Sequence, residues 1–220
     1  RSPEANLGLG LVLSFVAGAT NAGGFLAVGS YTSHMTGILS SVADDLILGN
    51  ITLALAGLVC LFAFISGAMC TAIMVNWGLR QDLRSSYSLP LLLESVALLV
   101  FGLFGSAIAA WSQVFVPVTV VLLCFIMGLQ NAVITKISKA EIRTTHITGL
   151  VTDLGIELGK LLYINRGHST LPVLANRQRL RVHGSLVMGF LLGGLVGALG
   201  FKHGGYITTL PLAAVLWILC

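Results

Sequence analysis

Apolar residues gather into long stretches along the whole chain, and short polar segments separate these stretches. A membrane-spanning helix needs about 20 largely apolar residues. Six stretches meet or approach this length, namely about 7–27, 51–77, 88–110, 117–135, 184–202 and 205–220. Two more stretches, about 33–48 and 145–161, are helical in pattern but are interrupted by acidic residues. The pattern predicts an all-α, polytopic membrane bundle with either six or eight spans.

The composition supports a membrane protein. Charged residues make up 9% of the 220 residues and hydrophobic residues 56%, whereas a soluble domain carries about 25% charged residues at its wetted surface. Twelve Lys and Arg with eight Asp and Glu cannot cover a soluble globule of this length. A soluble enzyme, a nucleic-acid-binding domain and a disordered linker are therefore excluded. The net charge of +4 is accordingly no sign of a nucleic-acid partner.

The basic residues choose between six and eight spans, because Lys and Arg concentrate in short cytoplasmic loops. Eight spans would divide the twelve basic residues into six on each side of the membrane. Six spans, with 33–48 on the outer side and 136–183 on the inner side, leave only Lys202 outside. We therefore expect six spans in the cell membrane with both termini in the cytoplasm. The two interrupted stretches are then short re-entrant or amphipathic helices.

A heptapeptide occurs twice in the chain, once in each half. Residues 32–38 read Thr-Ser-His-Met-Thr-Gly-Ile, and residues 144–150 read Thr-Thr-His-Ile-Thr-Gly-Leu. The flanking spans share further landmarks in the same order, among them Asn21 late in the first span and Asn131 late in the fourth. This recurrence predicts two sequence repeats.

The repeats divide a single membrane domain, 1–220, into 7–111 and 117–220. Each repeat comprises three spans and one short helix. Because three is an odd number, the second repeat is expected to be inverted relative to the first. Inverted repeats with discontinuous helices are a recurring plan of secondary transporters, whose sites lie near the midplane where the repeats meet.

A polar stripe runs along each predicted short helix at helical spacing. Its members are Thr36, Ser40, Asp44 and Asp45 in the first helix, and Thr148, Thr152, Asp153 and Glu157 in the second. Acids near a helix C-terminus oppose the helix dipole, and acids at membrane depth usually face water, a partner or a substrate. We expect the stripes to form the wall of a solute or ion pathway. Close helix packing by the small residues, with acids in interfacial water, is the alternative.

Two histidines and two asparagines complete the candidate site. His34 and His146 occupy the same place in the two heptapeptides, where an imidazole can relay protons or hold the turn structurally. Asn21 and Asn131 need hydrogen-bond partners in lipid, either a neighbouring helix or the solute. Glu94 lies inside the third span without a counterpart in the second repeat. It belongs either to the cytoplasmic interface or to the pathway.

The two Asn…Thr-[Ser/Thr]-His-x-Thr-Gly segments, each followed by an acidic residue, resemble the YoaK family of bacterial inner-membrane proteins. The resemblance covers nearly the whole chain. It implies a bacterial cytoplasmic-membrane protein with a domain of unknown function, and it implies no substrate. The candidate site therefore rests on the residue patterns alone.

From these features we expect a secondary transporter or facilitator of a small polar solute, with a proton or cation coupled through the acids. A non-transporting scaffold or accessory subunit and an ion channel are the alternatives. The sequence contains no P-loop, HExxH or GxSxG segment and no metal-ligand spacing of cysteines, so we expect no enzymatic activity, cofactor or metal. The expected partners are the lipid bilayer and the solute or ion. Gly189, Gly193 and Gly197 recur every four residues, a pattern that allows close helix contact either within one subunit or in a homo-oligomer.

Overall fold

The computed structural model describes residues 3–29, 31–82, 85–110, 112–137, 147–164 and 172–220. These residues form mainly helices, and no strand occurs among them. The helices are α1 (Pro3–Val28), α2 (Met35–Ile47), α3 (Ile51–Arg80), α4 (Ser88–Ala110), α5 (Ser112–Ile137), α6 (Ile147–Leu162), α7 (Arg177–Gly204), the 3-10 helix η1 (Gly205–Thr208) and α8 (Thr209–Ile218). The all-α prediction is confirmed for this part of the chain, and α2 and α6 lie where the two short helices were expected.

Five segments of the described chain are long and apolar enough to cross a membrane. They are Leu7–Ala27, Ile51–Arg80, Ser88–Gly105, Val118–Ile137 and Arg177–Ile218. The last segment combines α7, η1 and α8, which the sequence predicted as two spans. The ten residues of α8 rise only about 15 Å, half of a hydrocarbon core, so α8 does not qualify as a span by itself.

The most extensive helix–helix interface in the bundle is between α1 and α7. At their crossing, a side chain on Gly18 would overlap the carbonyl oxygen of Phe190, and one on Gly193 would overlap that of Phe15. The two glycines therefore let the two backbones touch. Such close approach through small residues is typical of helices in lipid, because the hydrophobic effect does not drive helix association there and close packing must do so.

The contact between α3 and α5 uses the same residue types. Here Gly67 lies against the carbonyl oxygen of Phe125, and Gly128 lies against that of Phe64. Each of the four helices thus brings a Phe-x-x-Gly segment to its crossing, at 15–18, 64–67, 125–128 and 190–193. The two main crossings of the bundle are built from one short motif.

Helices α1 and α5 run in opposite directions where they meet. The Gln130 side-chain amide donates a hydrogen bond of 3.0 Å to the carbonyl oxygen of Leu13. A side chain on Gly24, further along α1, would instead contact Leu123, which is earlier in α5. The order of contacts therefore reverses along the pair.

Helices α4 and α8 are also antiparallel. The Ser95 hydroxyl donates to the carbonyl oxygen of Ala213 at 2.8 Å, and the Thr209 hydroxyl donates to that of Leu98 at 3.1 Å. These bonds satisfy both hydroxyls inside a dry interface. Buried apolar side chains of α1, α4, α5, α7 and α8 join it in one continuous core, which includes Leu13, Phe101, Ile126, Leu186 and Leu216.

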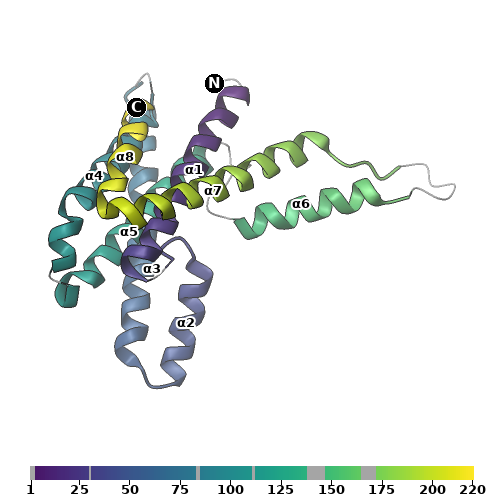
Figure 1. Cartoon of the computed structure of the whole chain (residues 1–220). Helices are drawn as coiled ribbons and strands as arrows, with labels where there is room; N and C mark the ends of the chain where they lie inside the picture. The colour runs from purple at the N-terminus through teal and green to yellow at the C-terminus, as the bar shows by residue number, and fades with distance from the viewer. Residues whose placement is uncertain (1–2, 30, 83–84, 111, 138–146, 165–171) are drawn as a thin grey trace.

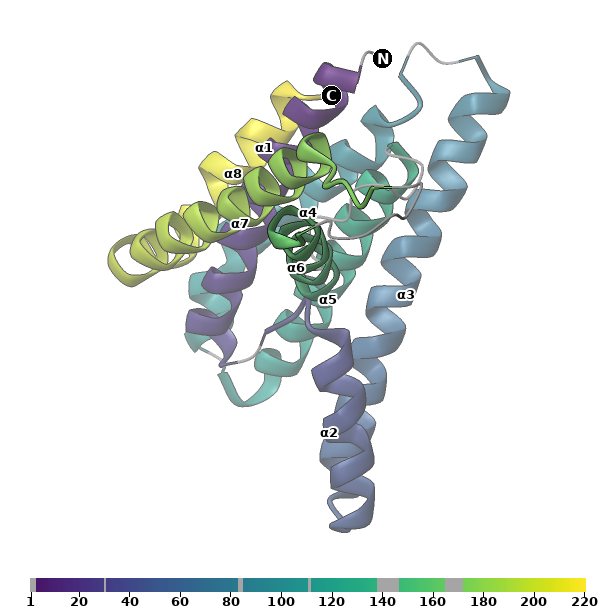
Figure 2. The same cartoon turned by 90° about the vertical axis from the view of Figure 1, so that its right-hand side faces the viewer.

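Two arms extend from this bundle (Figures 1 and 2). The first arm is α2 with the adjoining part of α3, and the second is α6 with the adjoining part of α7. Val42 is the buried residue of α2 and packs against Gly57 of α3. In Figure 1, α2 and α6 lie on the inner sides of the angle that the two arms enclose.

Candidate functional site

The polar stripe of α2 faces away from α3. Thr36, Ser40 and Asp44 are exposed, whereas Asp45 is half-buried at the tip of the arm. There the Asn50 side-chain amide donates to a carboxylate oxygen of Asp45 at 3.3 Å, and the Asn50 N–H donates to its backbone carbonyl at 2.8 Å. The stripe thus presents two free hydroxyl positions and one free carboxylate, while Asp45 also stabilises the turn into α3.

His34 stands at the start of α2 and is exposed. Its ring lies over Gly37, so closely that a side chain on Gly37 would overlap the ring. The His34 side chain makes no capping hydrogen bond to the helix. The Gly in the His-x-Thr-Gly segment is therefore explained by the space that the imidazole occupies. His146, its counterpart, lies outside the described residues.

The two asparagines have different surroundings. The side-chain oxygen of Asn21 accepts a hydrogen bond of 2.8 Å from the Ser33 hydroxyl, which ties the end of α1 to the turn before α2. The expected partner from the short-helix segment is thus present for Asn21. The side-chain oxygen of Asn131 is buried and has no hydrogen-bond partner among the described residues.

The polar stripe of α6 divides into an exposed part and a buried part. Thr148, Thr152 and Asp153 are exposed, and the Thr152 hydroxyl donates to the carbonyl oxygen of Thr148 one turn earlier. Glu157 is buried, with 4% of its surface exposed. The sequence treated Asp45 and Glu157 as equivalents, and the structure separates them by burial.

Glu157 holds the segment before α7 against α6. Its carboxylate forms an ion pair of 2.8 Å with the Lys160 ammonium and accepts a hydrogen bond of 2.6 Å from the Asn176 backbone N–H. The Lys160 ammonium and then the Asn176 N–H lower the pKa of Glu157. Both oxygens of this carboxylate are thereby engaged by the protein itself.

A histidine that the sequence patterns did not single out lies next to Asp153. The Nδ1 atom of His183, a buried residue of α7, is 3.8 Å from a carboxylate oxygen of Asp153. No hydrogen bond to this nitrogen occurs within the described residues. Because His183 lies 30 positions beyond Asp153, only the packing of α6 on α7 could bring the two together.

Glu94 lies in the interior of the bundle. Its exposure is 0%, and neither carboxylate oxygen has a hydrogen-bond partner among the described residues. The signal was present in the sequence, because Glu94 follows Leu91 by three positions and precedes Leu98 by four. This spacing places it on the same helix face as both leucines.

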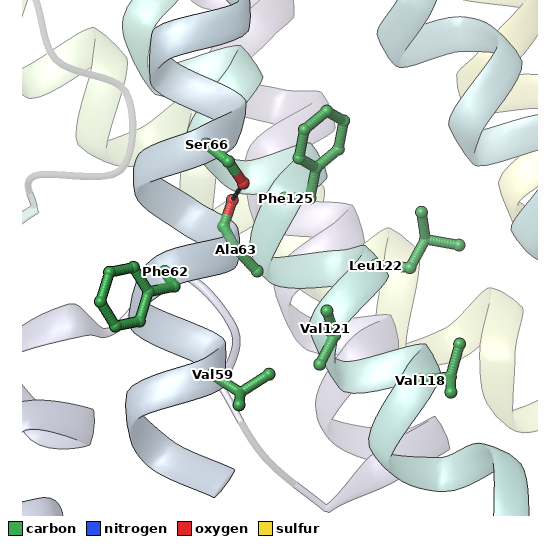
Figure 3. Close-up of a pocket in the computed structure, with 8 residues that line it drawn as sticks. All are labelled: Val59, Phe62, Ala63, Ser66, Val118, Val121, Leu122 and Phe125. Carbon is green, nitrogen blue, oxygen red and sulfur yellow. Dashed lines mark hydrogen bonds between the residues drawn. The ribbon is translucent and has the colours of Figure 1, made fainter. Parts of the chain in front are cut away.

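A groove between α3 and α5 is apolar (Figure 3). It is lined by Val59, Phe62, Ala63, Ser66, Val118, Val121, Leu122 and Phe125. Ser66 supplies the polar side chain of this set, and its hydroxyl donates to the Ala63 carbonyl at 2.8 Å. The groove therefore offers no free polar group to a solute. Among the described residues, no three His, Cys, Asp or Glu side chains gather as metal ligands.

Comparison with known proteins places the chain in a family without an assigned function. The chain is 27% identical over 164 residues to the UPF0700 transmembrane protein YoaK of Bacillus subtilis (strain 168), covering 72% of this chain and 70% of that protein. No solved structure matches it. The family model "Protein of unknown function (DUF1275)" matches residues 9–220. The chain is therefore a multi-pass membrane protein that belongs to the DUF1275 family.

Proposed function

We propose that this protein is a secondary transporter or facilitator of a small polar solute, built from two inverted repeats. The direction of corresponding helices supports the inversion. In the repeat alignment α5 corresponds to α1 and α8 to α4, and both pairs are antiparallel through the contacts of Gln130 with Leu13 and of Ser95 with Ala213. An eight-span chain with parallel repeats would orient each pair in the same direction.

The two main crossings give a second line of support. The first helix of each repeat packs against the third helix of the other, α1 on α7 and α5 on α3, and both crossings use Phe-x-x-Gly segments. The N-terminal end of α1 and the C-terminal end of α8 lie on the same side of the bundle (Figures 1 and 2). The six spans of the proposal would have this consequence, and the distribution of basic residues supports the cytoplasm for that side.

The observation that carries the transport proposal is the uncovered polar stripe on each short helix. Helices α2 and α6 use apolar residues such as Val42 and Leu150 to pack on α3 and α7. They leave hydroxyls and carboxylates exposed, and the two helices themselves lie on the inner sides of the two arms (Figure 1). Small hydroxyl residues can hydrogen-bond a polar solute, and a carboxylate can exchange a proton or cation.

One observation favours a second candidate, a non-transporting scaffold. Glu157 is buried and engaged by Lys160 and Asn176, which is the arrangement expected of an acid with a structural role. In this case the stripes would bind a partner protein or lie in interfacial water.

Accessibility of single cysteines tests the proposal. Ser40→Cys and Thr152→Cys, each in a chain whose native cysteines are replaced, are treated with a membrane-impermeant maleimide in sealed vesicles of either orientation. For a transporter, each site reacts from one side at a time, and the reactive side changes with pH or solute. Reaction from both sides at once would favour a channel. Lack of reaction from either side would favour the scaffold.

Val42→Cys is the matched control. It lies on the same helix as Ser40 but on the face that packs against Gly57. We expect it to remain unreactive from both sides. Reaction at Val42→Cys equal to that at Ser40→Cys would mean that α2 leaves α3, and the stripe would no longer define the accessible face.

A further inference from the structure

Glu94 is the acid for which the described chain provides neither solvent nor a partner. It lies in α4 within the candidate span Ser88–Gly105, two turns from the start of the helix. The neighbouring turns of the same face carry Leu91 and Leu98, which are buried with it. The side chain therefore points into the core and not toward lipid or water.

The neighbours of Glu94 leave it without polar compensation. The adjacent hydroxyl, Ser95, already donates to the carbonyl oxygen of Ala213, and Thr209 donates to that of Leu98. On the α8 side of this interface the buried residues include Leu212, Ala213 and Leu216. An ionised carboxylate without a partner in such surroundings has a very large desolvation penalty, and binding a proton removes it.

The elements packed against α4 bring few charged or titratable groups. Helix α8 has none, η1 has Tyr206, α5 has Cys124 and Lys136, and α3 has Cys60, Cys70 and Arg80. Lys136 is occupied by the side-chain oxygen of Asn76. Within the described chain, the ion pair of Lys160 with Glu157 and the contact of His183 with Asp153 do not include Glu94.

Just beyond α8 lies the exposed thiol of Cys220. A thiol supplies no positive charge to balance an ionised carboxylate at Glu94.

We propose that Glu94 is a proton-binding site in the membrane interior, the group that carries the coupled proton between the two sides. This inference rests on the transport function proposed above and adds the identity of the coupling ion and its residue. Glu94 releases its proton to one side of the membrane when movement at the α4–α8 interface admits water to the carboxyl group. It then binds another proton from the opposite side. Asp45, which accepts a hydrogen bond from Asn50, then contacts the solute. Glu157, which is paired with Lys160, stabilises the α6 arm.

The chemistry next to Glu94 fits a proton better than a metal cation. A hard cation such as Ca²⁺ takes about six to eight oxygen ligands. The hydroxyls of Ser95 and Thr209 donate to backbone carbonyls, and the remaining α8 side chains at the interface are apolar. A proton needs only the carboxylate itself.

Infrared spectroscopy of the full-length chain in phosphatidylcholine vesicles tests the proposal without a solute. We expect the carbonyl band of a neutral carboxylic acid at neutral pH, its conversion to carboxylate bands in alkaline buffer, and its loss in Glu94→Gln. The exposed acid provides the control, because Asp44→Asn should retain the band. Persistence of the band in Glu94→Gln, or its absence from the unmodified protein, would overturn the proposal. Removal of the band by Na⁺ at constant pH would also overturn it, in favour of a cation site.

Carbodiimide labelling provides a second measurement on the unmodified protein, so that the test does not depend on folding of a variant. A membrane-permeant carbodiimide reacts with protonated carboxyl groups in apolar surroundings. Peptide mass spectrometry should find Glu94 modified and Asp44 unmodified at neutral pH, with labelling of Glu94 lost in alkaline buffer. Labelling of Glu94 that is independent of pH would contradict proton binding. Because neither measurement involves transport, a failure here leaves the maleimide test of the transporter to be judged separately.

Discussion

The two arms carry an acidic residue at the same distance beyond the repeated histidine. Asp45 follows His34 by eleven positions, and Glu157 follows His146 by eleven. In the α2 arm the carboxylate is half-buried and its partner is the neutral amide of Asn50. In the α6 arm it is buried and its partners are an ammonium group and a backbone N–H.

A single position accounts for much of this difference. Lys160 stands three residues after Glu157, and Leu48 stands three residues after Asp45. Asn176, the residue before α7, also contacts Glu157, whereas the α2–α3 turn contributes Asn50 to Asp45. Repetition in the sequence therefore preserves the helix and its polar face, but the burial and the partners of the acid depend on what packs over it.

The two arms differ, but we expect the α1–α7 and α3–α5 crossings to lose similar stability when one of their glycines is replaced. This loss is the largest effect that we expect. Gly67→Ala and Gly193→Ala each place a methyl group against a backbone carbonyl, of Phe125 or Phe15, that cannot move independently of its helix. We expect both to destabilise the fold by on the order of 3 kcal/mol, measured by denaturant titration in mixed micelles.

The control for this pair is Gly155→Ala on α6. A side chain there meets nothing within 4 Å, and alanine favours a helix over glycine by up to about 1 kcal/mol. We expect no loss of stability. Unequal losses at Gly67 and Gly193 would show that the two crossings are not energetically equivalent.

The next effect separates the arms by their packing. Gly57→Ala collides with a methyl group of Val42, a stiff β-branched side chain, and should cost about 1–3 kcal/mol and loosen α2 from α3. Gly184→Ala brings its methyl group to an ordinary contact of 3.9 Å with Leu154 and should be tolerated. Hydrogen exchange of α2 and α6 measures each outcome. Protection of α2 that is unchanged in Gly57→Ala would refute the contact.

A smaller effect distinguishes the two acids. Glu157→Gln removes the charge that Lys160 and the Asn176 N–H stabilise, so residues 172–176 should become more susceptible to proteolysis and the melting temperature should fall. Asp45→Asn retains an acceptor for the neutral Asn50 amide and should have less effect. Equal melting shifts for the two variants would contradict the asymmetry of the arms.

The smallest effect is the pH dependence of the same contact. Because the pKa of Glu157 is lowered in the folded protein, its contribution to stability is fully present above the ordinary glutamate pKa. The contribution disappears as the pH falls through the lower pKa of the folded state. Melting temperatures of the unmodified protein and of Glu157→Gln should therefore converge in acid. A constant difference down to low pH would assign the contact another origin.

Local sequence patterns were sufficient for features that depend on one helix at a time. They predicted the short helices over 33–48 and 145–161, the long apolar helices, and a partner for Asn21 near the start of the first short helix. Each of these follows from periodicity, capping or the need of a buried amide for a hydrogen bond.

Features that depend on two distant elements were beyond the sequence. Glu157 meets Asn176 only because the chain reverses between α6 and α7, and His183 meets Asp153 for the same reason. The spacing of Glu94 with Leu91 and Leu98 places all three on one helix face, but only the packing of α4 in the bundle shows that this face is buried. The sequence divided this region into the spans 184–202 and 205–220, but it did not predict the 3-10 helix η1, which shortens the second of them to α8.

Each main crossing joins a helix from one half of the chain to a helix from the other half, α1 to α7 and α5 to α3. This arrangement also determines how the molecule can be assembled. Helix α1 is made well before α7, the helix that it packs along. The first half of the chain must therefore wait in the membrane with its Phe-x-x-Gly surfaces uncovered, and neither half can complete its own core. Two separately expressed halves should accordingly be unstable alone and should recover the fold only together.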